Sequence, residues 1–379
     1  EQVSLLWPEI FKHKICIAFA YKSFKWKNQA KDNAAVIVVI IGLRNISTDA
    51  QRTLYDASHK TYVKNISPYL INSSSIIVTR RNISISNLPT MPKGNMPYDG
   101  GNLILTPAEK NELLITFPNA KKHIKRLFGS FEFINGVERW CLWIRNEELE
   151  EALKIPIVGK RIENVRNMRF NSPDIGAHKL ALRAHQFREI NETITNTIII
   201  PSVSSENRDY IPMGFLGNDA IITNLAFAIY NVDSWLLGML SSKMHMTWVS
   251  TVGGRLKSDY RYSSELCYNT FPFPKISTEQ KNELTKTTLR IIEEREKHPE
   301  KTLAELYDPD KMPDGLREAH HQNDLAVERC YRSKPFTSDE ERLEHLFKLY
   351  EQMIEEEKSR GTLFEAQARP VKKGGKKKV

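Results

Sequence analysis

Ala35-Val36-Ile37-Val38-Val39-Ile40-Ile41-Gly42 belongs to the longest apolar run of the sequence, residues 34–43. A strand that is apolar on both faces is typical of a sheet covered on both sides, which indicates an α/β domain. An amphipathic stretch at residues 1–11 and a strand at residues 15–24 precede it. About 45 residues cannot form such a sheet alone. Since the sequence also opens on Glu1 instead of Met, we expect the last strands of a domain that begins upstream.

The rest of the sequence predicts a mixed α/β fold that ends in long, charged helices. Thr106-Pro107-Ala108-Glu109 is a helix start, with Thr at the N-cap, Pro at the first position and an acid in the first turn. Ser234 is placed to cap one amphipathic helix that runs through Trp248. Further strands are expected at residues 75–79, 139–144, 195–201, 210–214 and 220–222. Further helices are expected at residues 107–116, 120–127, 147–153, 157–169, 278–298, 314–331 and 338–360.

Charge favours a polyanionic partner, since each Lys or Arg on a phosphate releases a condensed counterion. The 379 residues carry a formal net charge of +9 and a pI of about 9.2. Five of the lysines lie in residues 371–378, and subtracting them leaves 9 − 5 = +4 for the rest. Part of the excess therefore belongs to a tail that is either a disordered remnant of cloning or a non-specific DNA contact.

Other features exclude several classes of protein. Cys16, Cys141, Cys267 and Cys330 are scattered, which gives no CxxC signal and is typical of a reducing cytoplasm. No signal peptide is visible, and residues 34–43 are too few to span a bilayer. The adjacent pair His320-His321 points in two directions on a helix, so we expect no metal site.

The densest chemistry lies in residues 253–263, Gly253-Gly254-Arg255-Leu256-Lys257-Ser258-Asp259-Tyr260-Arg261-Tyr262-Ser263. Arg and Lys donate to O6 and N7 of guanine, whereas Asp accepts from N4 of cytosine. If Lys257 and Asp259 lie on one extended segment, their spacing places both on one face. The segment would then offer a donor and an acceptor to one G·C pair. A solvated turn held by salt bridges is the alternative that this chemistry leaves open.

The same segment and its flanks resemble the target-recognition region of MmeI-like (Type IIL) adenine-specific DNA methyltransferases. The resemblance covers nearly the whole chain except the lysine-rich end, because further blocks match in the same order. The matching blocks are residues 1–3, 6–8, 24–28, 36–42, 91–94, 99–102, 129–130, 133–136, 201–206, 210–212, 244–248, 254–263, 268–274, 306–309 and 312–313.

The resemblance implies four segments. Residues 1–50 are expected to be the C-terminal strands of a class I methyltransferase sheet, and residues 51–275 an α+β target-recognition domain that binds DNA. Residues 276–365 are expected to form a helical region, and residues 366–379 a disordered basic tail. The intact family transfers a methyl group from S-adenosylmethionine to N6 of adenine in a short asymmetric site of duplex DNA, within bacterial restriction–modification systems. The target base is flipped out of the helix.

The resemblance also implies roles for single residues. Residues at the positions of Lys257 and Asp259 vary together with the base they read, and the Lys/Asp pair is similar to the version for guanine. Arg261 resembles a third base-reading position, and Leu225 a further one. A second group is expected to contact the DNA backbone or to support the reader: Arg255, Lys243, Tyr260, Tyr262 and Ser263.

The sequence departs from a complete enzyme of that family. It lacks the catalytic Asn-Pro-Pro-Tyr type motif and the glycine-rich cofactor loop. We therefore expect no catalytic residue and no bound S-adenosylmethionine on this chain, and no activity without the missing N-terminal catalytic portion of the same polypeptide. The expected setting is the cytoplasm, on nucleoid DNA, with no membrane contact.

Two alternatives belong to other classes. A stand-alone specificity module would recruit separate catalytic subunits, but it would not need the strands at residues 15–43. A general RNA- or single-strand-binding protein would use its Tyr and Trp rings as stacking platforms, with little preference for duplex sequence.

Overall fold

The computed structural model describes residues 2–26, 36–46 and 51–368. The chain folds into two compact units. Unit 1 combines Glu1–Leu88, Asn269–Pro274 and Phe336–Val379, and unit 2 combines Pro89–Tyr268 and Lys275–Pro335. The predicted polar turn at residues 27–33 and the lysine-rich end lie outside the described residues.

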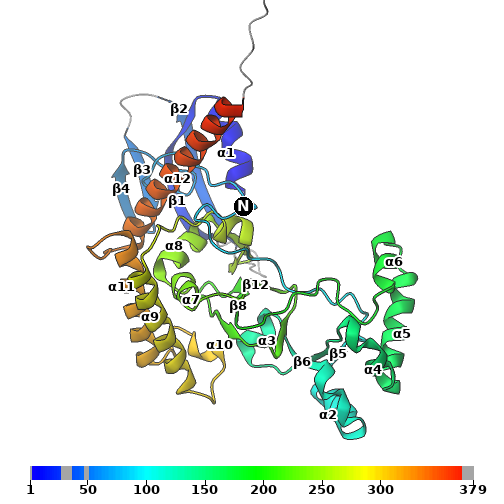
Figure 1. Cartoon of the computed structure of the whole chain (residues 1–379). Helices are drawn as coiled ribbons and strands as arrows, with labels where there is room; N and C mark the ends of the chain where they lie inside the picture. Colours follow the sequence, from blue (N-terminus) through cyan, green and yellow to red (C-terminus); the bar gives the residue numbers. More distant parts are fainter. Residues whose placement is uncertain (1, 27–35, 47–50, 369–379) are drawn as a thin grey trace, which may run out of the picture. The chain divides into compact units, whose positions relative to one another are not determined.

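Unit 1 is built on a four-stranded sheet of order β2-β1-β3-β4 (Figure 1). Helix α1 (Val3–Lys12) leads into β1 (Ile15–Trp26), which pairs antiparallel with β2 (Val36–Asn45) and parallel with β3 (Arg52–Asp56). β4 (His59–Val63) then pairs antiparallel with β3. The buried core comprises Trp7, Ile17, Ala20, Leu54 and Ile66. These elements confirm an amphipathic start followed by two strands.

The C-terminal helix returns to unit 1. Helix α12 (Asp339–Ala368) continues past the predicted ends at residues 360 and 365. Its Phe347 ring lies 5.2 Å from that of Tyr69, measured between ring centroids. Further along, Arg81 donates to Glu357 at 2.6 Å. Unit 1 is therefore assembled from segments that are distant in sequence.

Ile37 and Val39 are each 44% exposed, so the described residues leave part of β2 uncovered. The expected cover on both faces depends on segments upstream of this sequence, and it stays a prediction. Another expectation for unit 1 is wrong. Residues 75–79 form no strand, whereas the hairpin of β3 and β4 was not expected.

Unit 2 begins with a mixed sheet of order β11-β6-β7-β5. Its strands are β5 (Ile104–Leu105), β6 (Ile124–Phe128), β7 (Trp140–Leu142) and β11 (Ala220–Ile222). Helix α2 (Pro107–Thr116) begins at the predicted N-cap Thr106, and the structure adds a capping box, in which Thr106 accepts from the Glu109 N–H and Glu109 accepts from the Thr106 N–H. The helix expected at 120–127 is instead η1 (Pro118–His123) followed by β6, because residues 124–128 pair with neighbouring strands.

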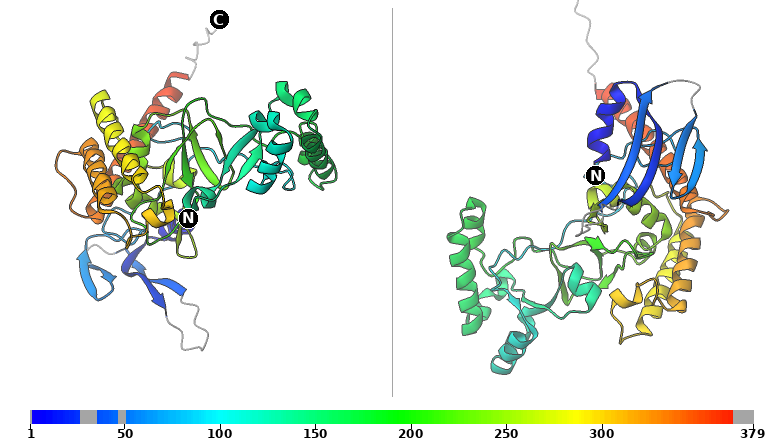
Figure 2. Two further views of the ribbon diagram at one scale, coloured as in Figure 1. Left: turned by 90° about the horizontal axis from the view of Figure 1, so that it is seen from below. Right: turned by 180° about the vertical axis from the view of Figure 1, so that it is seen from behind.

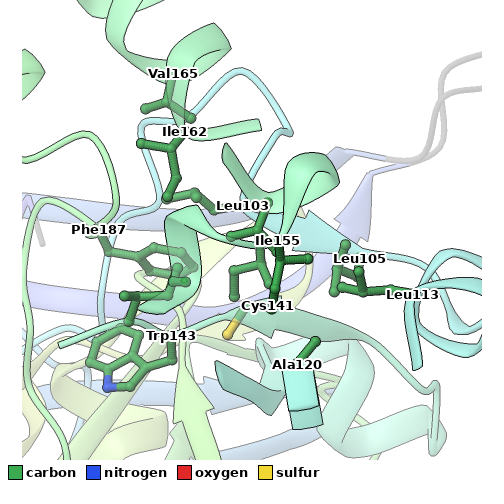
Figure 3. Packing of buried hydrophobic residues seen from close by; sticks show 14 of the residues in the cluster. Leu103, Leu105, Leu113, Ala120, Cys141, Trp143, Ile155, Ile162, Val165 and Phe187 are labelled. Atoms are coloured by element: carbon green, nitrogen blue, oxygen red, sulfur yellow. The ribbon is translucent and has the colours of Figure 1, made fainter. Parts of the chain in front are cut away.

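Short helices complete this part of unit 2. They are α3 (Ser130–Asn135), η2 (Asn146–Glu148), α4 (Leu149–Leu153), α5 (Pro156–Phe170) and α6 (Ile175–Ala181). Figure 3 shows Ile155, at the start of α5, close to Leu103 and Cys141 in the buried core. The rings of Trp143 and Phe187 meet edge to face there, with centroids 5.5 Å apart. This core positions α5 and α6 at the end of unit 2 that lies away from α9 and α11 (Figure 2).

Arg169 on α5 is a fully buried cation whose hydrogen bonds within the described residues all go to backbone carbonyls. Its guanidinium donates to five backbone carbonyls, those of Pro97, Tyr98, Leu180, Arg183 and Gln186, at 2.8–3.1 Å. Burial lowers the pKa of Arg169 to about 10, so the group stays protonated at neutral pH. The five acceptors replace the water that burial removes.

The second half of unit 2 joins a small sheet to a group of helices. The sheet has the order β10-β8-β12, with β8 (Thr197–Pro201), β10 (Gly214–Leu216) and β12 (Ala226–Tyr230). The helices are α7 (Trp235–Leu240), α8 (Lys243–Val252), α9 (Thr278–Glu296), α10 (Leu303–Leu306) and α11 (Asp314–Tyr331). Among the described residues, no helix is both long and apolar enough to cross a bilayer.

Two details of this half differ from prediction. The strand expected at residues 210–214 is reduced to the start of β10. The single helix expected after Ser234 is interrupted between α7 and α8, and Ser242 caps α8 by accepting from the His245 N–H at 3.3 Å. The interruption gives α8 its own N-terminus, and α8 leads directly into the segment that the sequence marks as functional.

Candidate nucleic-acid interface

Residues 254–261 form a β-hairpin with a two-residue turn. β13 (Gly254–Leu256) pairs antiparallel with β14 (Asp259–Arg261), with Leu256 opposite Asp259. The other edge of β14 pairs with β9 (Val203–Ser204), so that β14 is the central strand of three. The hairpin is therefore anchored along one side and free along the other within the described residues.

The donor–acceptor argument from the sequence required Lys257 and Asp259 to lie on one extended segment. The structure does not place them on one. Because Leu256 pairs with Asp259, the chain must reverse at Lys257 and Ser258. Lys257 takes a left-handed backbone conformation, with φ of 57°. It is Asp259 and Arg261 that share one face of β14 by alternation. Lys257 lies at the adjoining tip of the hairpin, so that a donor and an acceptor are still neighbours.

The opposite face of the hairpin carries Arg255 and Tyr260, which lie opposite each other. The guanidinium carbon of Arg255 is 4.0 Å from the centroid of the Tyr260 ring. Arg255 also donates to the carbonyl of Ser258 at 3.0 Å. The pair thus braces the turn and leaves part of the Arg255 side chain exposed.

Lys257 and Arg261 are exposed, and neither side chain has a hydrogen bond or ion pair with any described residue. A cation held in place by its backbone but not neutralised by a neighbour is available to an anionic ligand. The two positions therefore have the charge and exposure that contact with DNA requires.

The base of the hairpin is clamped to α8. Tyr262 and His245 are 3% and 1% exposed, and the Tyr262 hydroxyl lies 2.9 Å from Nε2 of His245 in a hydrogen bond. Burial lowers the pKa of His245 to about 3 and raises the pKa of Tyr262, so both groups are neutral. A Cβ on Gly253 would lie 2.4 Å from the carbonyl oxygen of Val249. Tyr262 therefore supports the hairpin from inside the protein.

Ser263 and Lys243 also belong to the support. The carbonyl of Ser263 accepts from the Cys267 N–H at 2.7 Å, which starts the helical turn η3 (Ser264–Tyr268). Nζ of Lys243 lies 3.4 Å from a carboxylate oxygen of Asp209 and 5.0 Å from the Tyr210 ring centroid. The structure thus directs the charge of Lys243 into unit 2.

Leu225 lies beside the hairpin of β13 and β14. Its side chain is 55% exposed, while its carbonyl accepts from the hydroxyls of Ser130 at 2.6 Å and Ser202 at 2.7 Å. The carbonyl of Ser202 in turn accepts from the Tyr262 N–H at 2.9 Å. Ser202 therefore links the Leu225 loop to the base of the hairpin.

Sequence reasoning missed the loop at residues 205–209. Its Glu206 N–H donates to Oδ1 of Asp259 at 3.3 Å. Arg208, two residues later, lies within electrostatic range of Asp259 and Asp308, while burial lowers the pKa of Arg208. The available signal was a charged loop that directly follows β9, but Asp259, the partner of Glu206, lies 53 residues away in sequence.

Among the described residues, two pairs of adjacent glycines lie outside helix starts. Gly100-Gly101 forms a turn, and Gly253-Gly254 leads into β13, so neither pair opens a helix. Gly129 does lie between β6 and α3, but its N–H already donates to Glu132 at 2.9 Å. In the same part of the chain we find no cluster of three or more His, Cys, Asp or Glu side chains that could hold a metal ion.

Comparison with known proteins identifies the family. The model "MmeI, target recognition domain" matches residues 72–275, "MmeI, C-terminal domain" matches 276–356, and "MmeI, DNA-methyltransferase domain" matches 1–56. DNA methyltransferase A of Bacillus subtilis (strain 168) is 51% identical over 355 residues, which are 94% of this chain and 40% of that protein.

A solved structure of the Type IIL restriction-modification enzyme MmeI in complex with DNA aligns with a TM-score of 0.82 and 37% identity. The alignment covers 94% of this chain and 48% of that one, so the chain spans less than half the length of either relative. Because the target recognition model alone matches more than half of the residues, this chain belongs to the MmeI family.

Proposed function

We propose that this chain supplies the sequence recognition of an S-adenosylmethionine-dependent adenine-N6 DNA methyltransferase of a bacterial restriction–modification system. The observation that carries the proposal is the exposed hairpin of β13 and β14 within the matched target recognition domain. It presents Lys257, Asp259 and Arg261, and its base is hydrogen-bonded to α8 through Tyr262 and His245. The MmeI structure found by comparison is a complex with DNA.

The shape of the hairpin suits duplex DNA. The major groove of B-DNA admits a two-stranded β-ribbon, and each base pair shows a distinct pattern of donors and acceptors there. Lys257 would donate to O6 and N7 of a guanine, and Asp259 would accept from N4 of the paired cytosine. Arg261 and Leu225 would read neighbouring positions, while Arg255, Tyr260 and Ser263 would contact the backbone or hold the reader. Single-strand binding by stacking is less favoured, because Tyr262 is buried.

Catalysis is assigned to a portion that this chain does not contain. The exposed apolar side chains of β2, among them Ile37, Val39 and Leu43, support docking of a preceding part of the same polypeptide on this strand. The cofactor and the catalytic residues would lie on that part, which would receive the flipped adenine. We accordingly assign residues 1–50 to the catalytic domain, 51–275 to recognition, 276–365 to a helical region and 366–379 to a basic tail. The protein would act in the cytoplasm on nucleoid DNA.

The proposal is tested by single-molecule methylation mapping of genomic DNA from cells that express the full-length gene. We expect N6-methyladenine in one asymmetric motif, with guanine at the position assigned to Lys257 and Asp259. The chain alone should bind duplex DNA without methylating it. A folded, well-expressed full-length protein that leaves no N6-methyladenine would instead favour the stand-alone specificity module.

A further inference from the structure

Leu256 is the apolar member of the hairpin face that carries the proposed base readers. It lies directly opposite Asp259 in the pairing of β13 with β14. Side chains of directly opposite residues in an antiparallel pair share one face, with Cβ atoms about 4.5–5.5 Å apart. By alternation along β14, Arg261 belongs to the same face. The face therefore combines one leucine with an acid and a cation.

The Leu256 side chain is accessible to a ligand. It is 52% exposed, and the outer edge of β13 has no strand beside it among the described residues. The preceding residue, Arg255, alternates to the opposite face of the hairpin. There its guanidinium carbon lies 4.0 Å from the centroid of the Tyr260 ring. The Arg255 side chain is therefore directed away from Leu256.

Asp259, the cross-strand neighbour of Leu256, is held from the other side of the hairpin. β9 pairs with the inner edge of β14, and the Glu206 N–H donates to Oδ1 of Asp259 at 3.3 Å. Asp259 thus belongs to the anchored strand, whereas Leu256 belongs to the outer one. A ligand that contacts Asp259 on this face consequently meets Leu256 beside it.

The chemistry of base-pair edges explains what an apolar side chain can do on this face. In the major groove, polar side chains pair with the donors and acceptors of the bases, whereas apolar side chains contact the C5-methyl group of thymine. A leucine pressed against a base donor or acceptor would leave that group without a hydrogen bond, which is unfavourable. An exposed leucine among charged readers therefore suits a methyl group better than a polar edge.

We propose that Leu256 is a specificity-determining residue that contacts the C5-methyl group of a thymine in a base pair next to the one assigned to Asp259. Successive base pairs are stacked about 3.4 Å apart, so two opposite side chains of the hairpin reach adjacent pairs. The inference rests on the proposed function, because it presupposes that this face of the hairpin enters the major groove. It adds an apolar contact to the hydrogen bonds of the other readers.

The test replaces thymine by uracil, which keeps the base pairing and removes only the methyl group. Equilibrium binding of the full-length protein is measured by anisotropy on duplexes with the methylated motif. Each thymine in the two base pairs that flank the position assigned to Asp259 is replaced singly. The variants are Leu256→Ala, which removes the apolar contact, and Leu256→Met, which keeps an apolar side chain of similar size. Ile115→Ala is the matched control, since Ile115 is an 83% exposed apolar residue on α2 of the same unit.

We expect the wild type to prefer thymine to uracil about fourfold at one of these positions, the effect of burying one methyl-sized group. Leu256→Ala should bind the thymine and uracil duplexes equally, because its loss of affinity is confined to the thymine duplex. Leu256→Met and Ile115→Ala should keep the preference. The melting temperature of each variant is recorded, and it should stay unchanged because the side chain is exposed.

Three results would overturn the inference while leaving the proposed function intact. If the wild type prefers thymine at neither adjacent pair, the methyl contact does not exist. A preference that persists in Leu256→Ala would assign the contact to another residue. Equal losses of Leu256→Ala on thymine and uracil duplexes would make Leu256 a packing residue of the hairpin. A wild-type protein that binds all duplexes equally would instead overturn the proposed function, and the inference with it.

Discussion

Replacing Lys257 by Gly separates the reading function of the hairpin tip from its stability. Lys257 has a φ of 57°, and a side chain in the left-handed region costs about 1–2 kcal/mol that Gly avoids. Against this, Gly costs about 0.5–1 kcal/mol in backbone entropy. The Lys257 side chain has no hydrogen bond or ion pair with the described residues. The free energy of unfolding should therefore stay unchanged or rise by up to about 1.5 kcal/mol.

DNA recognition should change in the opposite direction. A bidentate contact with guanine is worth about 1–3 kcal/mol, so discrimination for the guanine site should fall about 5- to 150-fold. Anisotropy titrations of the full-length protein on duplexes that carry each base pair at this position would measure the ratio, alongside thermal unfolding. Lys257→Asn is the matched control for the loss of the ammonium group. Asn also lacks that group, but it keeps a side chain that tolerates a positive φ.

Either of two outcomes would refute this reasoning. If Lys257→Gly weakens binding equally on all four duplexes, Lys257 contacts a phosphate and does not read a base. If the variant unfolds more easily than the wild type, the strain at position 257 is absent or is offset by contacts of the Lys side chain.

Three further predictions follow from the hairpin and its support. The double variant Lys257→Glu with Asp259→Arg, which reverses donor and acceptor, should change the base accepted in the methylated motif; an unaltered motif on methylation mapping would reject the assignment. Tyr262→Phe should lower the free energy of unfolding by about 1–3 kcal/mol in denaturant titrations, since buried His245 loses a hydrogen bond. Because the folded-state pKa of His245, about 3, lies below the ordinary value of about 6.5, the unfolded state binds more protons as pH falls below about 6.5. Stability should decrease there by up to about 1.4 kcal/mol per pH unit for this group, and His245→Asn should show a shallower decrease.

Local signals in the sequence were sufficient where the structure is local. The start of α2, with Thr106 at the N-cap and Glu109 in the first turn, depends on adjacent residues, and it was predicted correctly. The apolar run of β2 identified a strand, but its exposure depends on which segments cover it. The sequence of β2 alone does not show which segments cover the strand.

In the candidate site, too, the sequence did not predict features that depend on tertiary structure. The composition of residues 253–263 identified the candidate DNA-contacting segment. The turn at Lys257 and Ser258, however, lacks the Gly or Asn that is typical of a two-residue hairpin turn. The spacing argument therefore assumed one extended segment. The contact of Glu206 with Asp259 escaped notice for a different reason, because it arises from the pairing of β9 with β14 and not from any motif.

Arg169 has a consequence for the order in which unit 2 becomes structured. Its five carbonyl acceptors come from residues 97–98 and 180–186, on either side of α5 in the sequence. A buried guanidinium that lacked either set would be a strongly unfavourable intermediate. The segment before β5, the helix α5 and the chain beyond α6 should therefore gain and lose protection from hydrogen exchange together, as one cooperative folding unit.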